Sequence, residues 1–141
     1  MGIKEILIPS FFLTNIKTNS KKEALKLIIE EVKHDPHIID ADKLLQSLLE
    51  RENILSTEVA EGIHIPHTKC DAIEGIIVIY AKVTIGSKEE LFFVILSNNS
   101  LIRQYFKVIS QLAKLLNNSS FSTKIKETNN IEDIQHIIQV S

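Results

Sequence analysis

The centre of the chain reads Ile76-Ile77-Val78-Ile79-Tyr80-Ala81-Lys82-Val83. β-branched side chains dominate this run and both of its alternating faces are apolar, which is typical of a strand buried on both sides. A second apolar run of strand length covers residues 91–96. Apolar side chains at Ile63 and Ile65 indicate a further strand upstream. The middle of the chain therefore predicts a sheet.

Two helices are predicted before these strands. Ser20 to Glu23 reads S-x-x-E, a capping box that begins the first helix, and Asp35-Pro36 ends it, because the residue before proline disfavours the helical region. Asp40 is expected to cap a second helix that ends near Arg51-Glu52. Apolar stripes at helical spacing comprise Ala24, Leu25, Leu27, Ile28 and Val32 in the first helix, and Leu44, Leu45, Leu48 and Leu49 in the second.

Two more helices are predicted after the strands. Residues 98–100 form a turn and cap, a long helix follows from Leu101 to about Leu116, and Asn129-Asn130 caps a last helix. Helices on both sides of the strands in sequence predict an α/β fold, with one domain over residues 1–141 and a sheet covered by helices. The inward face of the long helix is predicted to comprise Ile102, Tyr105, Phe106, Ile109, Leu112, Ala113 and Leu116.

Composition narrows the class of protein. With 141 residues, 44% hydrophobic and 24% charged, the chain is long enough to bury a core without a disulfide or metal. A net charge of −2 argues against recruitment by nucleic acid. No apolar run approaches a membrane span, and residues 1–5 lack the layout of a secretory signal. A single cysteine, Cys70, favours a reducing, cytoplasmic compartment.

His67 is the first candidate for chemistry. In Gly62-Ile63-His64-Ile65-Pro66-His67, strand alternation puts Ile63, Ile65 and His67 on one face. Burial there would keep the imidazole neutral and nucleophilic near pH 7, since desolvation disfavours the charged ring. Pro66 lacks an N–H, so we expect the strand to end where His67 emerges. The same spacing also fits a half-buried structural histidine.

Arg51 is the second candidate. Its guanidinium, at the end of a helix, could bind phosphoryl oxygens through two parallel hydrogen bonds. The alternative is a solvated arginine that complements the helix dipole.

Other pairs of reactive residues have weaker support. His34 and His37, and likewise His64 and His67, have a spacing seen among metal ligands, but neither pair has further ligands in the sequence. Strand alternation also sends His64 and His67 to opposite faces. Cys70 lies three residues after His67 and could pair with it as a nucleophile, although a lone cysteine is more often an apolar filler. We therefore expect no metal.

A longer pattern joins the two candidates. Leu48-Leu49-Glu50-Arg51-Glu52-x-x-x-Ser56-Thr57, followed by Gly62-Ile63-x-Ile65-Pro66-His67, resembles the signature of fructose/mannitol-type EIIA domains of the bacterial phosphotransferase system. That family includes nitrogen-regulatory EIIA proteins. Residues 6–9 and 20–25 resemble its opening strand or loop and first helix, and residues 110–116 its late helix. The resemblance covers nearly the whole chain.

The resemblance implies a mixed β-sheet flanked by helices and a phosphotransferase component. His67 would accept a phosphoryl group from phospho-HPr or an HPr-like carrier and pass it to a cysteine of an EIIB partner. Arg51 matches the active-site arginine of the family, and Thr57, Gly62 and His64 would neighbour the phosphoryl group. The family uses no organic cofactor or metal for this step.

The chain departs from the family pattern in two places. Where a second histidine usually stands near the start of the late helix, the sequence has Tyr105, which can donate a hydrogen bond but cannot carry a positive charge. The loop after Ser56-Thr57, which usually contains glycines, reads Glu58-Val59-Ala60-Glu61, and His64 stands where a small residue is usual. The acidic side chains either repel a phosphoryl group or point to solvent.

Three functions remain open from the sequence. The first is a sugar-system phosphocarrier, and the second is a regulatory EIIA whose His67 phosphorylation state controls binding to transporter or sensor partners. The third is a degenerate module that binds partners without phosphorylation. None of them involves nucleic acid or membrane insertion.

Overall fold

The structure is a computed structural model that describes residues 2–141. Its centre is a mixed sheet with the strand order β1-β5-β6-β3-β2, and β4 pairs with β6 beyond the end of β3. β5 and β6 form an antiparallel hairpin, and β2 is antiparallel to β3, whereas β1 runs parallel to β5 and both β3 and β4 run parallel to β6. The strands are β1 (Phe11–Thr18), β2 (Glu58–Ala60), β3 (Ile63–His64), β4 (His67–Cys70), β5 (Ile76–Ile85) and β6 (Lys88–Asn98).

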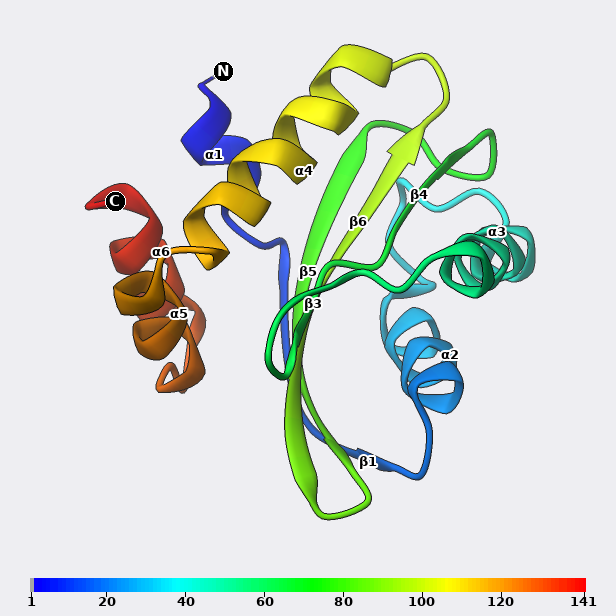
Figure 1. Ribbon diagram of the computed structural model, residues 1–141. Helices are drawn as coiled ribbons and strands as arrows, with labels where there is room; N and C mark the ends of the chain where they lie inside the picture. Colours follow the sequence, from blue (N-terminus) through cyan, green and yellow to red (C-terminus); the bar gives the residue numbers. More distant parts are fainter. Residues whose placement is uncertain (1) are drawn as a thin grey trace.

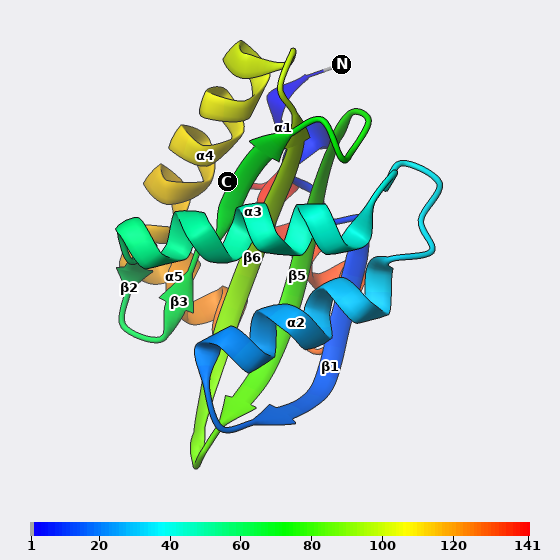
Figure 2. The same cartoon turned by 90° about the vertical axis from the view of Figure 1, so that its right-hand side faces the viewer.

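Helices cover both faces of this sheet (Figure 1). In the view turned by 90°, α2 and α3 lie side by side across one face of the sheet (Figure 2). The other four helices gather on the opposite face. The helices are α1 (Ile3–Leu7), α2 (Lys21–Val32), α3 (Ala41–Ile54), α4 (Ile102–Leu116), α5 (Ser119–Lys126) and α6 (Ile131–Gln139). The α/β fold with a mixed sheet flanked by helices is therefore confirmed.

Side-chain caps begin three helices where the sequence predicts them. The Ser20 hydroxyl accepts a hydrogen bond from the Glu23 N–H at 3.1 Å, the Asp40 carboxylate from Lys43 N–H at 3.1 Å, and the Asn130 amide oxygen from Asp133 N–H at 2.9 Å. Each satisfies a backbone donor that the helix leaves free, which is worth about 1 kcal/mol per cap.

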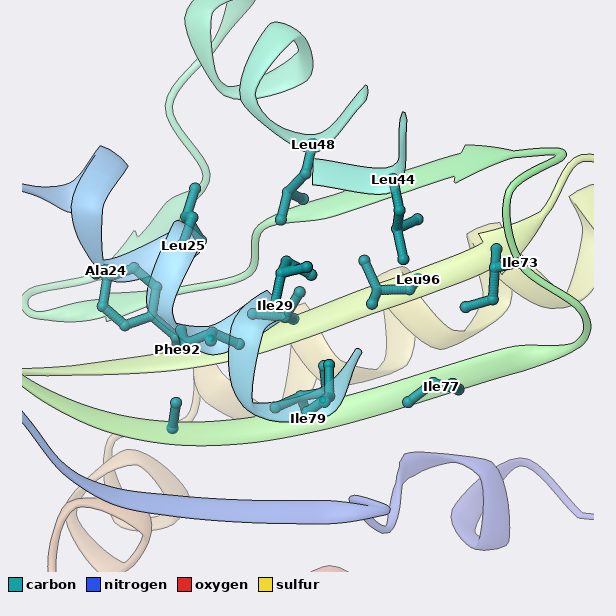
Figure 3. Packing of buried hydrophobic residues seen from close by; sticks show 14 of the residues in the cluster. Ala24, Leu25, Ile29, Leu44, Leu48, Ile73, Ile77, Ile79, Phe92 and Leu96 are labelled. Carbon is teal, nitrogen blue, oxygen red and sulfur yellow. The ribbon is translucent and has the colours of Figure 1, made fainter. Parts of the chain in front are cut away.

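Two hydrophobic cores lie on the two faces of the sheet. Figure 3 shows the core under α2 and α3, where Leu25, Ile29, Leu44 and Leu48 meet strand side chains. The strand side of this core includes Ile77, Ile79, Phe92 and Leu96. The intervening strand positions, among them Val78, Tyr80, Phe93 and Ile95, pack on the other face against α4, α5 and α6. β5 is thus buried on both faces, as its sequence predicts.

The structure corrects the prediction that Pro66 ends the strand. β4 begins at His67 and continues the parallel pairing with β6, because the Pro66 carbonyl still accepts a hydrogen bond from Ile95 N–H at 2.9 Å. Proline removes a donor but keeps its acceptor, so the ladder survives the interruption between β3 and β4.

The inward face of α4 also differs from the prediction. Val108 is fully buried, whereas Ile102 and Phe106 are about half exposed. No side chain caps this helix, since its N-cap residue is Leu101, although residues 98–100 do form the predicted turn. α3 continues to Ile54, beyond its predicted end. α1 forms a short helix at the start of the chain, and β1 and α5 were not predicted.

Candidate functional site

His67 opens β4 at the edge of the sheet, and its side chain is partly buried on the α4 face. Its Nδ1 lies 2.6 Å from the Ile65 carbonyl oxygen. A carbonyl oxygen can only accept, so Nδ1 carries the proton and donates it to this oxygen. In the neutral ring the lone pair is then on Nε2, the atom that can attack an electrophile.

Burial keeps this ring neutral. Desolvation lowers the pKa of His67 below its ordinary 6.5, and the nearby positive charge of Arg51 lowers it further. The hydrogen bond to Ile65 and the negative charge of Glu52 act in the opposite direction without reversing the shift. At pH 7 the imidazole is therefore uncharged and nucleophilic.

Arg51 lies in the last turn of α3. Its charge lowers the pKa of both His67 and Tyr105, which places the three groups in one electrostatic environment. Among residues 2–141 no carboxylate lies within ion-pair distance of its guanidinium. The cation is thus available to an anion that approaches His67.

Tyr105 lies beside His67. Their ring centroids are 5.9 Å apart, and the planes are tilted by 57°. The Tyr105 side chain is almost fully buried, and desolvation raises its pKa to about 12 despite the opposing charge of Arg51. It is a neutral phenol at physiological pH and can donate one hydrogen bond.

Thr57 belongs to a bonded chain behind these groups. Its hydroxyl donates to Glu52 Oε1 at 2.6 Å, and Glu52 Oε2 forms an ion pair with Lys21 Nζ at 2.7 Å. The Thr57 carbonyl oxygen accepts from Ile65 N–H at 3.0 Å. Thr57 therefore connects the end of α3 to the segment that holds His67. Glu52 was not among the predicted site residues, because its acidic type gave no positive signal for phosphate binding.

Gly62 and His64 precede His67 in that segment, and the His64 side chain points to the opposite face of the sheet. Gly62 has a positive φ of 74°, and its carbonyl accepts from Leu91 N–H at 2.8 Å. The His64 ring stacks on Phe92, which belongs to the core under α2 and α3. His64 and His67 therefore face opposite sides of the sheet, as predicted, and the structure does not bring them together as a metal pair.

The other candidates also separate from His67. Cys70 is buried in the core under α2 and α3, away from the His67 ring that lies beside Tyr105. His37 is engaged through Nδ1 with Asp35 at 2.7 Å. The negative charge of Glu58 opposes the lowering of the His64 pKa by burial. The charged groups that shift the pKa of His67 are instead Arg51, which lowers it, and Glu52, which raises it.

The segment that carries His67 and Arg51 lies within a region that matches a known protein family. The sequence model of the family described as "Phosphoenolpyruvate-dependent sugar phosphotransferase system, EIIA 2" matches residues 5–140. The chain belongs to this family. The resemblance inferred from the Arg51, Thr57 and His67 motifs is therefore confirmed at the level of the family.

Relatives of this EIIA chain fall into two groups. It is 26% identical to a nitrogen regulatory protein of Pseudomonas aeruginosa, over 96% of this chain and 94% of that protein. It is also 26% identical to a "PTS system fructose-specific EIIA component" of Haloferax volcanii, over 84% and 82% of the two chains. Both regulatory and sugar-specific members thus resemble the chain.

Solved structures share the fold. The nitrogen regulatory protein IIA-Ntr of Neisseria meningitidis superposes with a TM-score of 0.77 at 20% identity, covering 96% of this chain and 98% of that one. The mannitol enzyme IIA of Escherichia coli, solved in complex with phosphorylated enzyme IIB, superposes with a TM-score of 0.71 at 18% identity, covering 100% and 98%. Among residues 2–141, no helix combines the length and hydropathy needed to cross a membrane.

Proposed function

We propose that this EIIA chain is a histidine phosphocarrier in which His67 Nε2 accepts a phosphoryl group from phospho-HPr or a similar carrier and passes it to a cysteine of an EIIB partner. The hydrogen bond from Nδ1 to the Ile65 carbonyl supports this most directly, because it leaves Nε2 as the only lone pair of a neutral ring. The family match and the mannitol IIA–IIB complex support the direction of transfer.

The bonds balance in each step. The Nε2 lone pair forms a bond to phosphorus as the bond from phosphorus to the donor imidazole breaks, and the donor ring keeps that electron pair. His67 then carries positive charge, which the Ile65 oxygen stabilises through the Nδ1 proton. A thiolate of the EIIB partner next attacks phosphorus, and the electron pair returns to Nε2. His67 ends as it began.

Arg51 supplies charge rather than covalent chemistry. Phosphoryl transfer spreads negative charge over three equatorial oxygens, and positioning with electrostatic stabilisation accounts for most of its catalysis. The guanidinium has no ion-pair carboxylate within residues 2–141, so it can bind these oxygens without first breaking a protein contact. Tyr105 can add one neutral donor or pack against the ring.

Apolar side chains around this site support docking of protein partners. Ile54, in the same last turn of α3 as Arg51, and Leu55, directly after it, are largely exposed. Phe106 is half exposed, and its ring packs 5.2 Å from that of Tyr105. Exposed aromatic and aliphatic side chains near a reactive group are typical of a recognition surface.

A regulatory role is the second candidate. Sequence similarity supports it, because the alignment with the Pseudomonas nitrogen regulatory protein covers 96% and 94% of the two chains, against 84% and 82% for the fructose-specific component. In that role the phosphorylation state of His67 would change the affinity for a transporter or sensor protein, and the acceptor chemistry of His67 would be the same.

Intact-mass measurement after incubation with phosphoenolpyruvate, enzyme I and HPr tests the acceptor. We expect a gain of one acid-labile phosphate, its loss in His67→Ala, and its retention in the control His37→Ala, which removes an exposed imidazole. Uptake that survives in His67→Ala would disprove the assignment. No uptake by the unmodified protein would favour the degenerate binding module.

A further inference from the structure

Three potential metal ligands converge on the sheet face opposite His67. His64 comes from β3, Glu58 from β2 and Glu90 from β6, and one ligand atom of each lies within 4.8 Å of the others. His64 Nε2 and Glu90 Oε1 are 3.6 Å apart. His64 is the register partner of Glu58 across β2 and β3. These side chains are thus adjacent because of strand pairing.

His64 is unusual for a buried histidine. Its side chain is only 8% exposed, and within residues 2–141 neither ring nitrogen has a hydrogen-bond partner. Leaving a buried polar group unpaired is unfavourable, because the group loses its hydrogen bonds to water without replacing them. Stacking on Phe92, with centroids 4.8 Å apart and planes 16° apart, fixes the direction of the ring.

Both carboxylates lie against the backbone at Gly62. Glu58 Oε2 accepts a hydrogen bond from Gly62 N–H at 3.0 Å. Glu90 occupies the space that a side chain at Gly62 would need, since a Cβ there would lie 2.8 Å from Glu90 Oε2. The neighbouring cation Lys21 is paired with Glu52 at 2.7 Å. A hollow of about 460 Å³ that is open to solvent is lined in part by both glutamates, but not by His64.

We propose that His64, Glu58 and Glu90 form a binding site for a divalent transition-metal ion of the Zn²⁺ type. One imidazole nitrogen, one oxygen from each carboxylate and water would complete a four-coordinate site. Zinc binds nitrogen and oxygen at about 2.0–2.2 Å in a tetrahedron, which separates neighbouring ligands by roughly 3.4 Å. The 3.6 Å between His64 and Glu90 agrees with this spacing. An imidazole in the set disfavours Mg²⁺ and Ca²⁺, which select oxygen ligands.

Such an ion would join the hairpin of β2 and β3 to β6. The same hairpin leads directly into Pro66 and His67. The metal would therefore stabilise the segment that presents the phosphoryl acceptor, while taking no part in the transfer, because the His67 ring lies on the other face of the sheet.

Titration of the metal-free, full-length protein tests the site. With ZnCl₂ we expect one ion bound per chain by calorimetry and a rise in melting temperature of several degrees, since a ligand that binds only the folded state stabilises it. With Co²⁺ we expect the visible absorption of a four-coordinate ion.

Paired variants locate the ligands. Glu90→Gln should reduce zinc affinity at least about tenfold and remove the cobalt absorption, and His64→Gln should do the same. Glu89→Gln is the matched control, because it removes the same charge from the neighbouring exposed residue and should retain both signals. If His64→Gln fails to fold, Glu90→Gln decides alone. No zinc-dependent rise in melting temperature, or equal zinc affinity in Glu90→Gln and Glu89→Gln, would overturn the proposal.

Discussion

At the scale of single residues, two local effects set the protonation state of His67. The Ile65 carbonyl fixes which nitrogen is protonated, and burial with Arg51 fixes whether the ring is charged. Both effects follow from the position of His67 after a proline at a strand edge, where the ring reaches back to the carbonyl two residues before it. Reactivity is thus a property of the local backbone as much as of the imidazole.

The protonation state of His67 gives the first prediction. Because desolvation and Arg51 lower its pKa, the ring should take up a proton only below pH 6.5. NMR titration of the imidazole Cε1–H resonance should give a midpoint under this value. Arg51→Ala should raise the midpoint, since removal of a nearby cation favours the charged ring, while Arg51→Lys should raise it less. A midpoint at or above 6.5 in the unmodified protein would contradict this.

The guanidinium of Arg51 gives the second prediction. If it binds two phosphoryl oxygens at once, Arg51→Lys should slow phosphoryl uptake by about 10- to 1,000-fold, because a point charge cannot replace the planar fork. Rapid-quench kinetics with phospho-HPr measures the rate, and circular dichroism checks the fold. Arg103→Lys, on the exposed side of α4, is the matched control and should transfer normally. Normal transfer by Arg51→Ala would leave Arg51 a structural residue.

Tyr105 gives the third prediction, because it stands where the family usually has a second histidine. Its hydroxyl is a neutral donor with a pKa near 12, so it cannot share positive charge with the phosphorylated ring. We expect Tyr105→His to speed exchange with the donor and Tyr105→Phe to slow it. Rapid-quench rates together with a melting curve for each variant separate chemistry from packing. Unchanged transfer in Tyr105→Phe, with a less stable Tyr105→His, would show that Tyr105 only packs.

At the scale of the elements, the sequence predicts what depends on local chemistry. Caps at Ser20, Asp40 and Asn130 are recognisable because each bonds a backbone N–H three residues away. β5 is recognisable because it is apolar on both faces. β1 is not, because Asn15 adopts a positive φ of 63° within a register shift between Leu13 and Ile16, which breaks the alternation of apolar residues.

The candidate site also combines residues that local sequence identifies with residues that only tertiary contacts identify. His67 and Arg51 are recognisable as candidates from a short motif, and strand alternation predicts the opposite orientation of His64 and His67 that the structure shows. Glu52 and Glu90 are not, since their roles depend on Lys21, Thr57 and His64 coming together from separate elements. The buried face of α4 does follow helical spacing through Tyr105, Val108, Leu112 and Leu116, whereas Ile102 and Phe106 lie outside this stripe and are half exposed.

The connection between α3 and β3 gives the fourth prediction. Thr57→Val keeps the shape of the side chain but removes the donor to the buried Glu52 carboxylate. We expect a loss of about 1–3 kcal/mol in the free energy of unfolding, because a buried acceptor loses a partner. Urea denaturation measures it. Ser56→Ala alters the exposed neighbouring hydroxyl and should cost clearly less. Equal stability of the two variants would show that the hydrogen bond from Thr57 to Glu52 does not stabilise the fold.

At the scale of the whole molecule, the site lies where the two helical layers meet the edge of the sheet. α3 crosses one face and ends near β2 and β3 (Figure 2), bringing Arg51 to that edge. α4 covers the other face and contributes Tyr105. His67 on β4 is reached from both layers. A reactive group at an edge can meet a partner protein without any opening of the core.

This arrangement gives the last prediction, which concerns docking and depends on the proposed function. Phe106 is 54% exposed beside Tyr105, so Phe106→Ser should weaken recognition of the phospho-donor without changing the groups that react. We expect KM for phospho-HPr to rise about tenfold with kcat nearly constant, as for an interface residue worth above 1 kcal/mol. The melting temperature should hardly change, because the lost surface is solvent-exposed. Ile39→Ser is the matched control, since Ile39 is 61% exposed before the start of α3, about 20 Å along that helix from its Arg51 end. If both variants raise KM equally, or Phe106→Ser lowers kcat instead, the donor does not dock over α4.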